Sequence, residues 1–185
     1  STANALALVR AQVAAGETAK AAAFLEDWMR RHPNDLAALK ALAEAQFRAG
    51  QLAAARESYA RVVAIAPDDA VTLNNYANLL LQLNDPTAQA TAEKAVKLSP
   101  SNPNYADTLG WILVRTGQVD AGLRYLREAR LRSPENGEIR FHLAWALART
   151  GRMAEAKEEL SAALAGPGKV SSSLEVGQLR KELGL

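Results

Sequence analysis

Cysteine is absent from this sequence, and its absence excludes disulfide bonds, thiol catalysis and cysteine-ligated metal sites. Aromatic residues are scarce, at 5% of the chain. Valine and isoleucine together supply only 13 of the 185 residues, so the β-branched residues that strands favour are few. No apolar run approaches the length of a membrane span. The chain is therefore not expected to be a disulfide scaffold, a strand-rich domain or a membrane-spanning segment.

Neither sign of charge dominates. The 22 basic and 20 acidic residues leave a net charge of +2, too small for a domain that holds nucleic acid by neutralising phosphates, so no nucleic-acid partner is expected. The first residues lack the basic and apolar regions of a signal peptide, and an initiating methionine is missing as well. A targeting segment upstream is compatible with this start, and the sequence by itself assigns no localisation.

What the chain has in abundance is alanine and leucine. There are 39 alanines and 26 leucines, which together make 65 of 185 residues. Both rank among the strongest helix formers, because neither loses much side-chain freedom in a helix. The composition predicts an all-α fold.

Two kinds of helix-breaking residue recur with one period. Prolines recur at intervals of 33 or 34 residues, at Pro33, Pro67, Pro100, Pro134 and Pro167. Residues that tolerate positive φ recur at the same intervals, at Gly16, Gly50, Asn84, Gly117 and Gly151. Each period therefore predicts one helix that ends at the glycine or asparagine and a second that ends before the proline.

The period divides the chain into five helix pairs, predicted at about 2–35, 36–69, 70–102, 103–136 and 137–169, so that the repeat array spans 1–169. Capping residues are predicted at Asp35, Asp69, Asp85 and Asn102, the last two followed by a proline at the first helical position. Residues 170–185 differ from the repeat. Ser172 and Glu175 have the spacing of a capping box, which predicts a short C-terminal helix that caps the last repeat.

Small residues recur where neighbouring helices of the array must approach closely. They are Ala43, Ala77, Gly110 and Ala144 on the first helices, and Ala21, Ala55, Ala88, Gly122 and Ala156 on the second helices. Together with Leu39, Leu42, Tyr59 and Pro67, this pattern resembles the tetratricopeptide repeat (TPR), a helix–turn–helix unit of 34 residues. The resemblance implies a right-handed α-solenoid of about five TPR helix pairs plus a C-terminal capping helix.

The residue types needed for catalysis are isolated. His32 lies in an expected turn, and His142 has no second ligand or base at helical spacing. The paired acidic residues lack the apolar surroundings that shift a carboxyl pKa for acid–base work. We therefore expect no enzyme, no cofactor and no metal site.

The resemblance implies instead that recurring positions of the first helices line a concave groove that binds a protein or peptide. Carried over residue by residue, the groove-facing candidates are Lys40, Phe47, Arg48, Asn74, Asn75, Asn78, Gln82, Asp107, Trp111, Arg115, His142, Trp145 and Arg149. Three features have two interpretations each. The asparagines either grip a peptide backbone or bond neighbouring helices, the tryptophans are either exposed anchors or packed between repeats, and the arginines either bind acidic groups or favour helix C-termini.

A narrower resemblance rests on Asp107-Thr-Leu-Gly-Trp111 and on the segment from Glu138 to Ala144. These strings are similar to the C-terminal repeats of bacterial TPR lipoproteins of the PEP-CTERM/exosortase system and of exopolysaccharide loci. This resemblance implies a scaffold of the bacterial envelope, in the periplasm or on the outer membrane, that serves protein sorting or exopolysaccharide export. The alternatives are a structural scaffold that self-associates through the array ends or convex face, and an accessory region of a larger enzyme.

Overall fold

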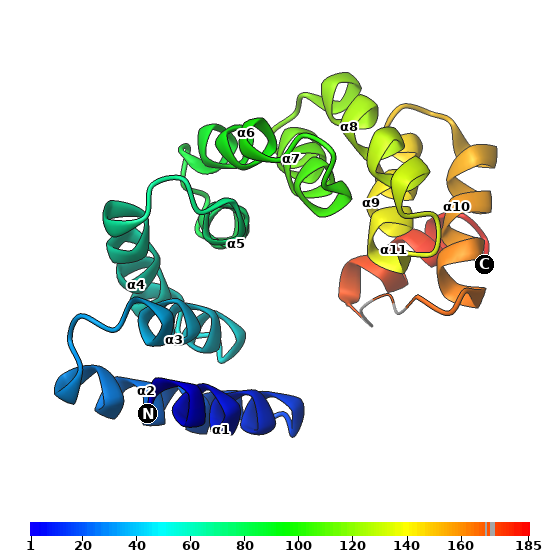
Figure 1. Ribbon diagram of the computed structural model, residues 1–185. Helices are drawn as coiled ribbons and strands as arrows, with labels where there is room; N and C mark the ends of the chain where they lie inside the picture. Colours follow the sequence, from blue (N-terminus) through cyan, green and yellow to red (C-terminus); the bar gives the residue numbers. More distant parts are fainter. Residues whose placement is uncertain (169, 171–172) are drawn as a thin grey trace. The chain divides into compact units, whose positions relative to one another are not determined.

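The computed structural model describes residues 1–168, 170 and 173–185, and within them it contains eleven α-helices and no strand. Figure 1 shows the helices coloured along the chain. They are α1 (Thr2–Ala14), α2 (Thr18–Arg31), α3 (Leu36–Arg48), α4 (Leu52–Ile65), α5 (Ala70–Gln82), α6 (Ala88–Leu98), α7 (Pro103–Arg115), α8 (Val119–Arg132), α9 (Gly137–Arg149), α10 (Met153–Ala165) and α11 (Leu174–Glu182). The predicted all-α class is confirmed. The chain divides into two compact units, Ser1–Thr91 (unit 1) and Ala92–Leu185 (unit 2), and each is described by itself.

The two series of helix breakers set the helix ends. Each first helix of a pair ends two residues before a residue of the glycine/asparagine series, and all five of these residues have positive φ, from 52° at Asn84 to 90° at Gly117. Each second helix ends two residues before a proline of the proline series. The turns predicted from the 34-residue period are therefore present, because glycine and asparagine enter the left-handed region that other residues avoid.

Side-chain caps begin the first helices of the later pairs. Asp35 accepts a hydrogen bond from the backbone N–H of Ala38, and Asp69 accepts one from Thr72, both at 3.0 Å. Asn102 caps α7, with Pro103 as its first helical residue. These three caps were predicted correctly.

The start of α6 was predicted wrongly. Pro86 does not begin the helix, which starts two residues later at Ala88. Asp85 accepts hydrogen bonds from the backbone N–H and the hydroxyl of Thr87, at 2.9 Å and 2.6 Å. This tight side-chain turn takes up the residues that would have formed the first turn of α6.

Unit 1 is built around α3. This helix packs against α2 and α4 and also contacts the neighbouring first helices α1 and α5. Its buried side chains Leu39 and Leu42 join Leu25 of α2 and Val62 of α4 in one apolar cluster. A second cluster surrounds the buried ring of Tyr59, which stacks on Tyr76 of α5 with ring centroids 5.7 Å apart. The first helices of neighbouring pairs, α1, α3 and α5, thus contact one another in sequence, which brings their exposed faces onto one side of the unit.

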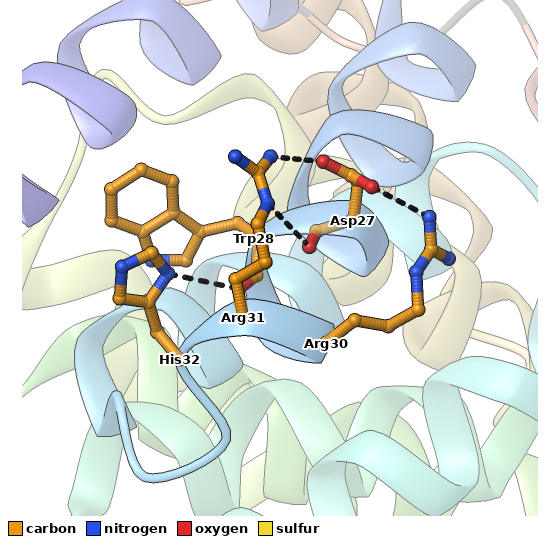
Figure 2. A network of polar contacts seen from close by, with 5 residues as sticks. All are labelled: Asp27, Trp28, Arg30, Arg31 and His32. Atoms are coloured by element: carbon orange, nitrogen blue, oxygen red, sulfur yellow. Dashed lines mark hydrogen bonds and ion pairs between the residues drawn. The ribbon is translucent and has the colours of Figure 1, made fainter.

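Asp35 joins three helices of unit 1 at one carboxylate. Besides capping α3, it accepts hydrogen bonds from the hydroxyl of Thr2 at 2.7 Å and from the indole N–H of Trp28 at 3.0 Å. Figure 2 shows His32 beside the indole ring of Trp28, and Asp27 bound to Arg30 and Arg31. The rings of Trp28 and His32 stack with their centroids 4.1 Å apart. Burial raises the pKa of Asp35, but the hydrogen bonds from Ala38, Trp28 and Thr2 outweigh it, and the pKa is lowered overall.

We expect Asp35→Ala to destabilise unit 1 by about 2–3 kcal/mol, because the change removes a helix cap and leaves the indole N–H of Trp28 without its acceptor. Asp35→Asn keeps an acceptor and should cost less. Since the pKa of Asp35 is lowered in the folded state, the stabilising contribution is present at neutral pH and is lost as the pH falls below about 4. Urea unfolding at pH 7 and pH 3 tests this; a stability gap that does not shrink at pH 3 would contradict it.

In unit 2 two helices approach each other closely at a pair of glycines. Gly110 of α7 and Gly122 of α8 face each other, and a Cβ atom built on Gly122 would lie 2.7 Å from the carbonyl oxygen of Gly110. The helix α9 then packs against α7, α8 and α10. In α7 every residue from Tyr105 to Val114 is buried, so this helix has no exposed face along ten residues.

The helices are short. The longest have 14 residues, and no described helix has the length and apolar character needed to cross a membrane.

Candidate functional site

Unit 1 carries an open groove along its first helices. The groove has a volume of about 590 Å³ and is lined by α1, α3, the start of α5 and Tyr59 of α4. The lining is largely apolar, and it is provided by Leu6, Val9, Val13, Ala14, Ala37, Ala41, Ala45 and Val71. We call this surface the α1–α3–α5 groove. Its width across three helices and its apolar lining suit a peptide segment.

One residue of the α1–α3–α5 groove carries a buried polar atom. The hydroxyl oxygen of Tyr59 is inaccessible to water and has no hydrogen-bond partner among the described residues. Burial raises the pKa of this hydroxyl, and the nearby carboxylate of Glu44 raises it further. The hydroxyl therefore stays protonated.

Charged side chains border the same groove. Lys40 bridges α3 to Asp69, the cap of α5, and Glu44 binds Arg48 one turn further along α3 at 2.8 Å. Burial raises the pKa of Asp69, but the hydrogen bonds from Lys40 and Thr72 lower it by more. Lys40 and Asn75, both predicted from sequence, line the groove, whereas Arg48 is engaged by its own helix.

The other predicted residues of unit 1 lie outside that lining. Phe47 packs edge-on against Tyr59, with ring centroids 6.5 Å apart, and Gln82 is exposed at the end of α5. Asn74 is only 9% exposed and donates to the side-chain oxygen of Asn75 at 3.4 Å, while Asn78 is partly buried. Asn75 thus lies in the groove lining, whereas Asn74 is buried and its side-chain bond stays within its own helix.

In unit 2 the predicted aromatic pair forms part of a cluster between repeats. Trp111 of α7 is 8% exposed and stacks on His142 of α9, with ring centroids 4.3 Å apart. Phe141 and the partly buried Trp145 complete the cluster, at 6.0 Å and 6.1 Å from Trp111. Of the two interpretations given to Trp111, the structure shows packing between repeats.

His142 also links the two repeats through its ring nitrogen. Its Nδ1 atom lies 2.9 Å and 3.0 Å from the two carboxylate oxygens of Asp107, which is buried in α7. The two residues predicted to face a groove therefore bind each other. Among the residues that the structure describes, no cluster of three or more histidine, cysteine or acidic side chains could hold a metal ion.

The two predicted arginines of unit 2 each lie over a tryptophan and each bind the C-terminal helix. Arg115 lies 5.2 Å from the ring centre of Trp111, and Arg149 lies 4.4 Å from that of Trp145. Arg115 donates to Glu175 at 2.7 Å, and Arg149 donates to Glu182 at 2.9 Å. Both acceptors belong to α11. These arginines therefore bind acidic groups, as one of the two interpretations predicted, but the acidic groups are those of the same chain.

The prediction for α11 needs one correction. Ser172, the predicted cap, lies outside the described residues, and Ser173 caps the helix by accepting from the backbone N–H of Val176 at 3.2 Å. Glu175 does not complete a capping box, because its side chain binds Arg115.

Sequence reasoning also missed part of the α1–α3–α5 groove. The α1 residues Leu6, Val9 and Val13 were not predicted, although their spacing of three and four residues indicates one apolar helix face. Tyr59 was missed as a groove residue because it belongs to a second helix, and nothing in the sequence shows that its ring reaches between first helices.

A family model described as "Tetratricopeptide repeat" matches residues 6–70 and 108–169, which together make up more than half of the chain. The chain belongs to the tetratricopeptide repeat family. TPR proteins are typically non-catalytic and bind other proteins, so this membership assigns protein partners to the chain as a class.

Two curated relatives are bacterial. A TPR repeat-containing protein of Pseudomonas aeruginosa is 31% identical over 126 residues, 67% of this chain and 21% of the relative. Cellulose synthase 1 operon protein C of Komagataeibacter xylinus is 31% identical over 170 residues, 87% of this chain and 12% of the relative. This TPR chain thus spans about a fifth or less of the length of each of these relatives.

Three solved structures share the fold. A thermophilic TPR protein of Thermus thermophilus has a TM-score of 0.80 at 22% identity, covering 100% of this chain and 97% of that one. Pseudomonas aeruginosa PilF has a TM-score of 0.75 at 20% identity, with 98% and 83% covered. MamA of Desulfovibrio magneticus RS-1 has a TM-score of 0.73 at 19% identity, with 86% and 91% covered. At these identities the likeness concerns the fold alone.

Proposed function

We propose that this TPR chain is a non-catalytic interaction module that binds an extended peptide or a partner helix in the α1–α3–α5 groove. The observation that carries the proposal is the groove itself, which is open, about 590 Å³ in volume and lined by three successive first helices. Its apolar lining offers burial to a partner's side chains, and its polar border can fix the partner's direction.

We further propose that the module serves a scaffold of the bacterial envelope, linked to exopolysaccharide export or protein sorting. Two observations support this. A relative at 31% identity carries the name cellulose synthase 1 operon protein C, and the Asp107–Trp111 string is similar to TPR lipoproteins of PEP-CTERM/exosortase and exopolysaccharide loci. This proposal implies that the protein is a lipoprotein located in the periplasm or on the outer membrane.

The first test places a charge at the mouth of the groove without touching the core. Val71 lines the groove and is 60% exposed, so Val71→Glu should keep the fold. We expect it to weaken binding of a partner segment at least about tenfold, because the segment would have to desolvate the new carboxylate. Partners would be captured from envelope fractions of the source organism, identified by quantitative mass spectrometry and then titrated as purified segments by calorimetry.

Ile65→Glu is the matched control. Ile65 is 62% exposed in the same unit, at the end of α4, and does not line the groove. A partner held equally by both variants would refute groove binding and favour the convex face. Association of the chain with itself that ignores both substitutions would support the alternative of a self-assembling scaffold.

A further inference from the structure

The C-terminal helix α11 lies across the C-terminal ends of two first helices of unit 2. Glu175 binds Arg115 at the end of α7, and Glu182 binds Arg149 at the end of α9. The ammonium group of Lys157, in α10, lies 3.4 Å from the carbonyl oxygen of Gly184. Figure 1 shows α11 beside α9 and α10. The helix therefore does more than cap the last repeat, since it also reaches the repeat before it.

The spacing of the two acidic residues matches the spacing of two repeats. Glu175 and Glu182 are seven residues apart, which is two helical turns or roughly 10.5 Å. Neighbouring packed helices lie about 8–10 Å apart, so one helix laid across α7 and α9 can present one carboxylate to each. We call Trp111, Arg115, Trp145 and Arg149 the tryptophan–arginine face; each tryptophan precedes its arginine by four residues on the same helix.

The same positions in unit 1 are occupied differently. In α3 they hold Glu44 and Arg48, which bind each other, so this arginine already has its carboxylate. In unit 2 a tryptophan replaces the glutamate, and the arginines reach outward over the indole rings to α11. The tryptophan–arginine face is therefore built to receive two carboxylates from outside its own helices.

The side of α11 that is turned to the protein is apolar between its two acidic ends. Val176, Leu179 and Leu183 are buried, and Leu179 has no exposed surface at all. The two acidic residues, Glu175 and Glu182, are seven positions apart. The apolar residues Val176, Leu179 and Leu183 follow Glu175 by one, four and eight positions. The face binds this helix through its two acidic residues, Glu175 and Glu182.

Three features make α11 a weakly held occupant. It has nine residues, too few for a stable isolated helix, and Gly177 at its centre lowers its helix propensity with no packing reason, since a Cβ there would meet nothing within 4 Å. Both ion pairs are partly exposed to solvent, and such pairs contribute little each. Residues 166–173 separate α11 from α10, twice the four residues that separate consecutive pairs elsewhere, as between α8 and α9.

We propose that the tryptophan–arginine face is a receptor for an acidic amphipathic helix of a protein partner, and that α11 occupies it until the partner displaces it. The partner helix carries two acidic residues seven positions apart on either side of an apolar stripe. While α11 is bound, its high effective concentration blocks a partner of equal intrinsic affinity. This proposal is independent of the α1–α3–α5 groove and stands or falls separately.

The test uses the full chain and a fluorescein-labelled synthetic peptide of residues 173–185 as the probe. Leu179→Asp forces a charge into the buried side of α11 and should release it. We expect this variant to bind the peptide at least about tenfold more tightly than the wild type, measured by fluorescence anisotropy. The matched control is Leu174→Asp in the same helix, where the side chain is 78% exposed and binding should stay at the wild-type level.

Two further variants fix the interpretation. Glu175→Lys/Glu182→Lys should release α11 by repulsion from the arginines, giving the same tighter binding, and Arg115→Glu/Arg149→Glu added to Leu179→Asp should abolish it. Equal peptide binding by the wild type and both release variants overturns the proposal. So does loss of amide-exchange protection throughout α7 and α9 in both release variants, which would make α11 a structural cap. Dimerisation of the release variants in sedimentation experiments, without peptide binding, also overturns it in favour of a second copy as occupant.

Discussion

Replacing Gly122 with leucine is expected to destabilise unit 2 by more than about 3 kcal/mol. A Cβ at this position would lie 2.6 Å from a methyl group of Val114 and 2.7 Å from the carbonyl oxygen of Gly110. The carbonyl belongs to the backbone of α7 and cannot rotate away, so the two helices would have to separate along their whole contact. Overpacking a tight core costs about 1–3 kcal/mol for smaller intrusions, and an isobutyl group exceeds those.

The matched control compares two separate glycine-to-alanine substitutions within the same unit. Gly122→Ala should destabilise unit 2 by about 2–3 kcal/mol because of the same backbone contact. Gly177→Ala should instead stabilise α11 by up to about 1 kcal/mol, because nothing lies within 4 Å of the added methyl group and alanine favours the helix. Urea unfolding followed by circular dichroism, with amide exchange to assign the loss to unit 2, measures both. Equal effects of the two substitutions would contradict the proposed close approach of α7 and α8.

Trp111→Ala is expected to cost about 3–5 kcal/mol, the loss typical of a buried tryptophan. The indole stacks on His142, meets Phe141 and Trp145 and lies beneath Arg115, so its removal leaves a cavity between two repeats. Because stability in repeat proteins is carried by the interfaces between neighbouring repeats, the loss should appear as faster amide exchange in α7 and α9.

Two variants control for this effect. Trp111→Phe fills most of the site and should cost much less, and Trp145→Ala should also cost less because this side chain is only partly buried. A stable Trp111→Ala protein would show that the ring adds little to packing. If it is destabilised as expected, loss of a binding partner by this variant cannot be taken as evidence that the ring touches the partner.

The repeat was predictable from the sequence because the residues that begin and end its helices act locally. Gly117 ends α7 through its own positive φ, and Asp35 and Asp69 cap helices that begin one residue later. Such signals need no knowledge of distant residues. The exception at α6 is also local, since the hydroxyl and the backbone N–H of Thr87 both donate to the carboxylate of Asp85, and the helix starts only after this turn.

The candidate sites were predicted only in part. Lys40 and Asn75 were placed on the α1–α3–α5 groove through the family's recurring positions, but Tyr59 was not, because a second helix supplies it. For unit 2, sequence reasoning identified the recurring Trp111 and Trp145 and the arginines four residues after them. It left open whether the rings are exposed, since helical periodicity says which residues share a face and not what covers that face.

The sequence by itself determined the helical class, the 34-residue period, the turns at its glycines and prolines, and the small residues at which α7 and α8 meet. These depend on backbone sterics and on contacts between helices adjacent in the chain. Only the tertiary structure decided that Trp111 is packed between repeats and that α11 reaches back to Arg115, sixty residues earlier. The physical reason is that α11, an amphipathic helix with two acidic residues, could pack on any apolar surface that has basic side chains at its border. Which face it covers depends on the geometry of α7, α9 and the connecting segment together.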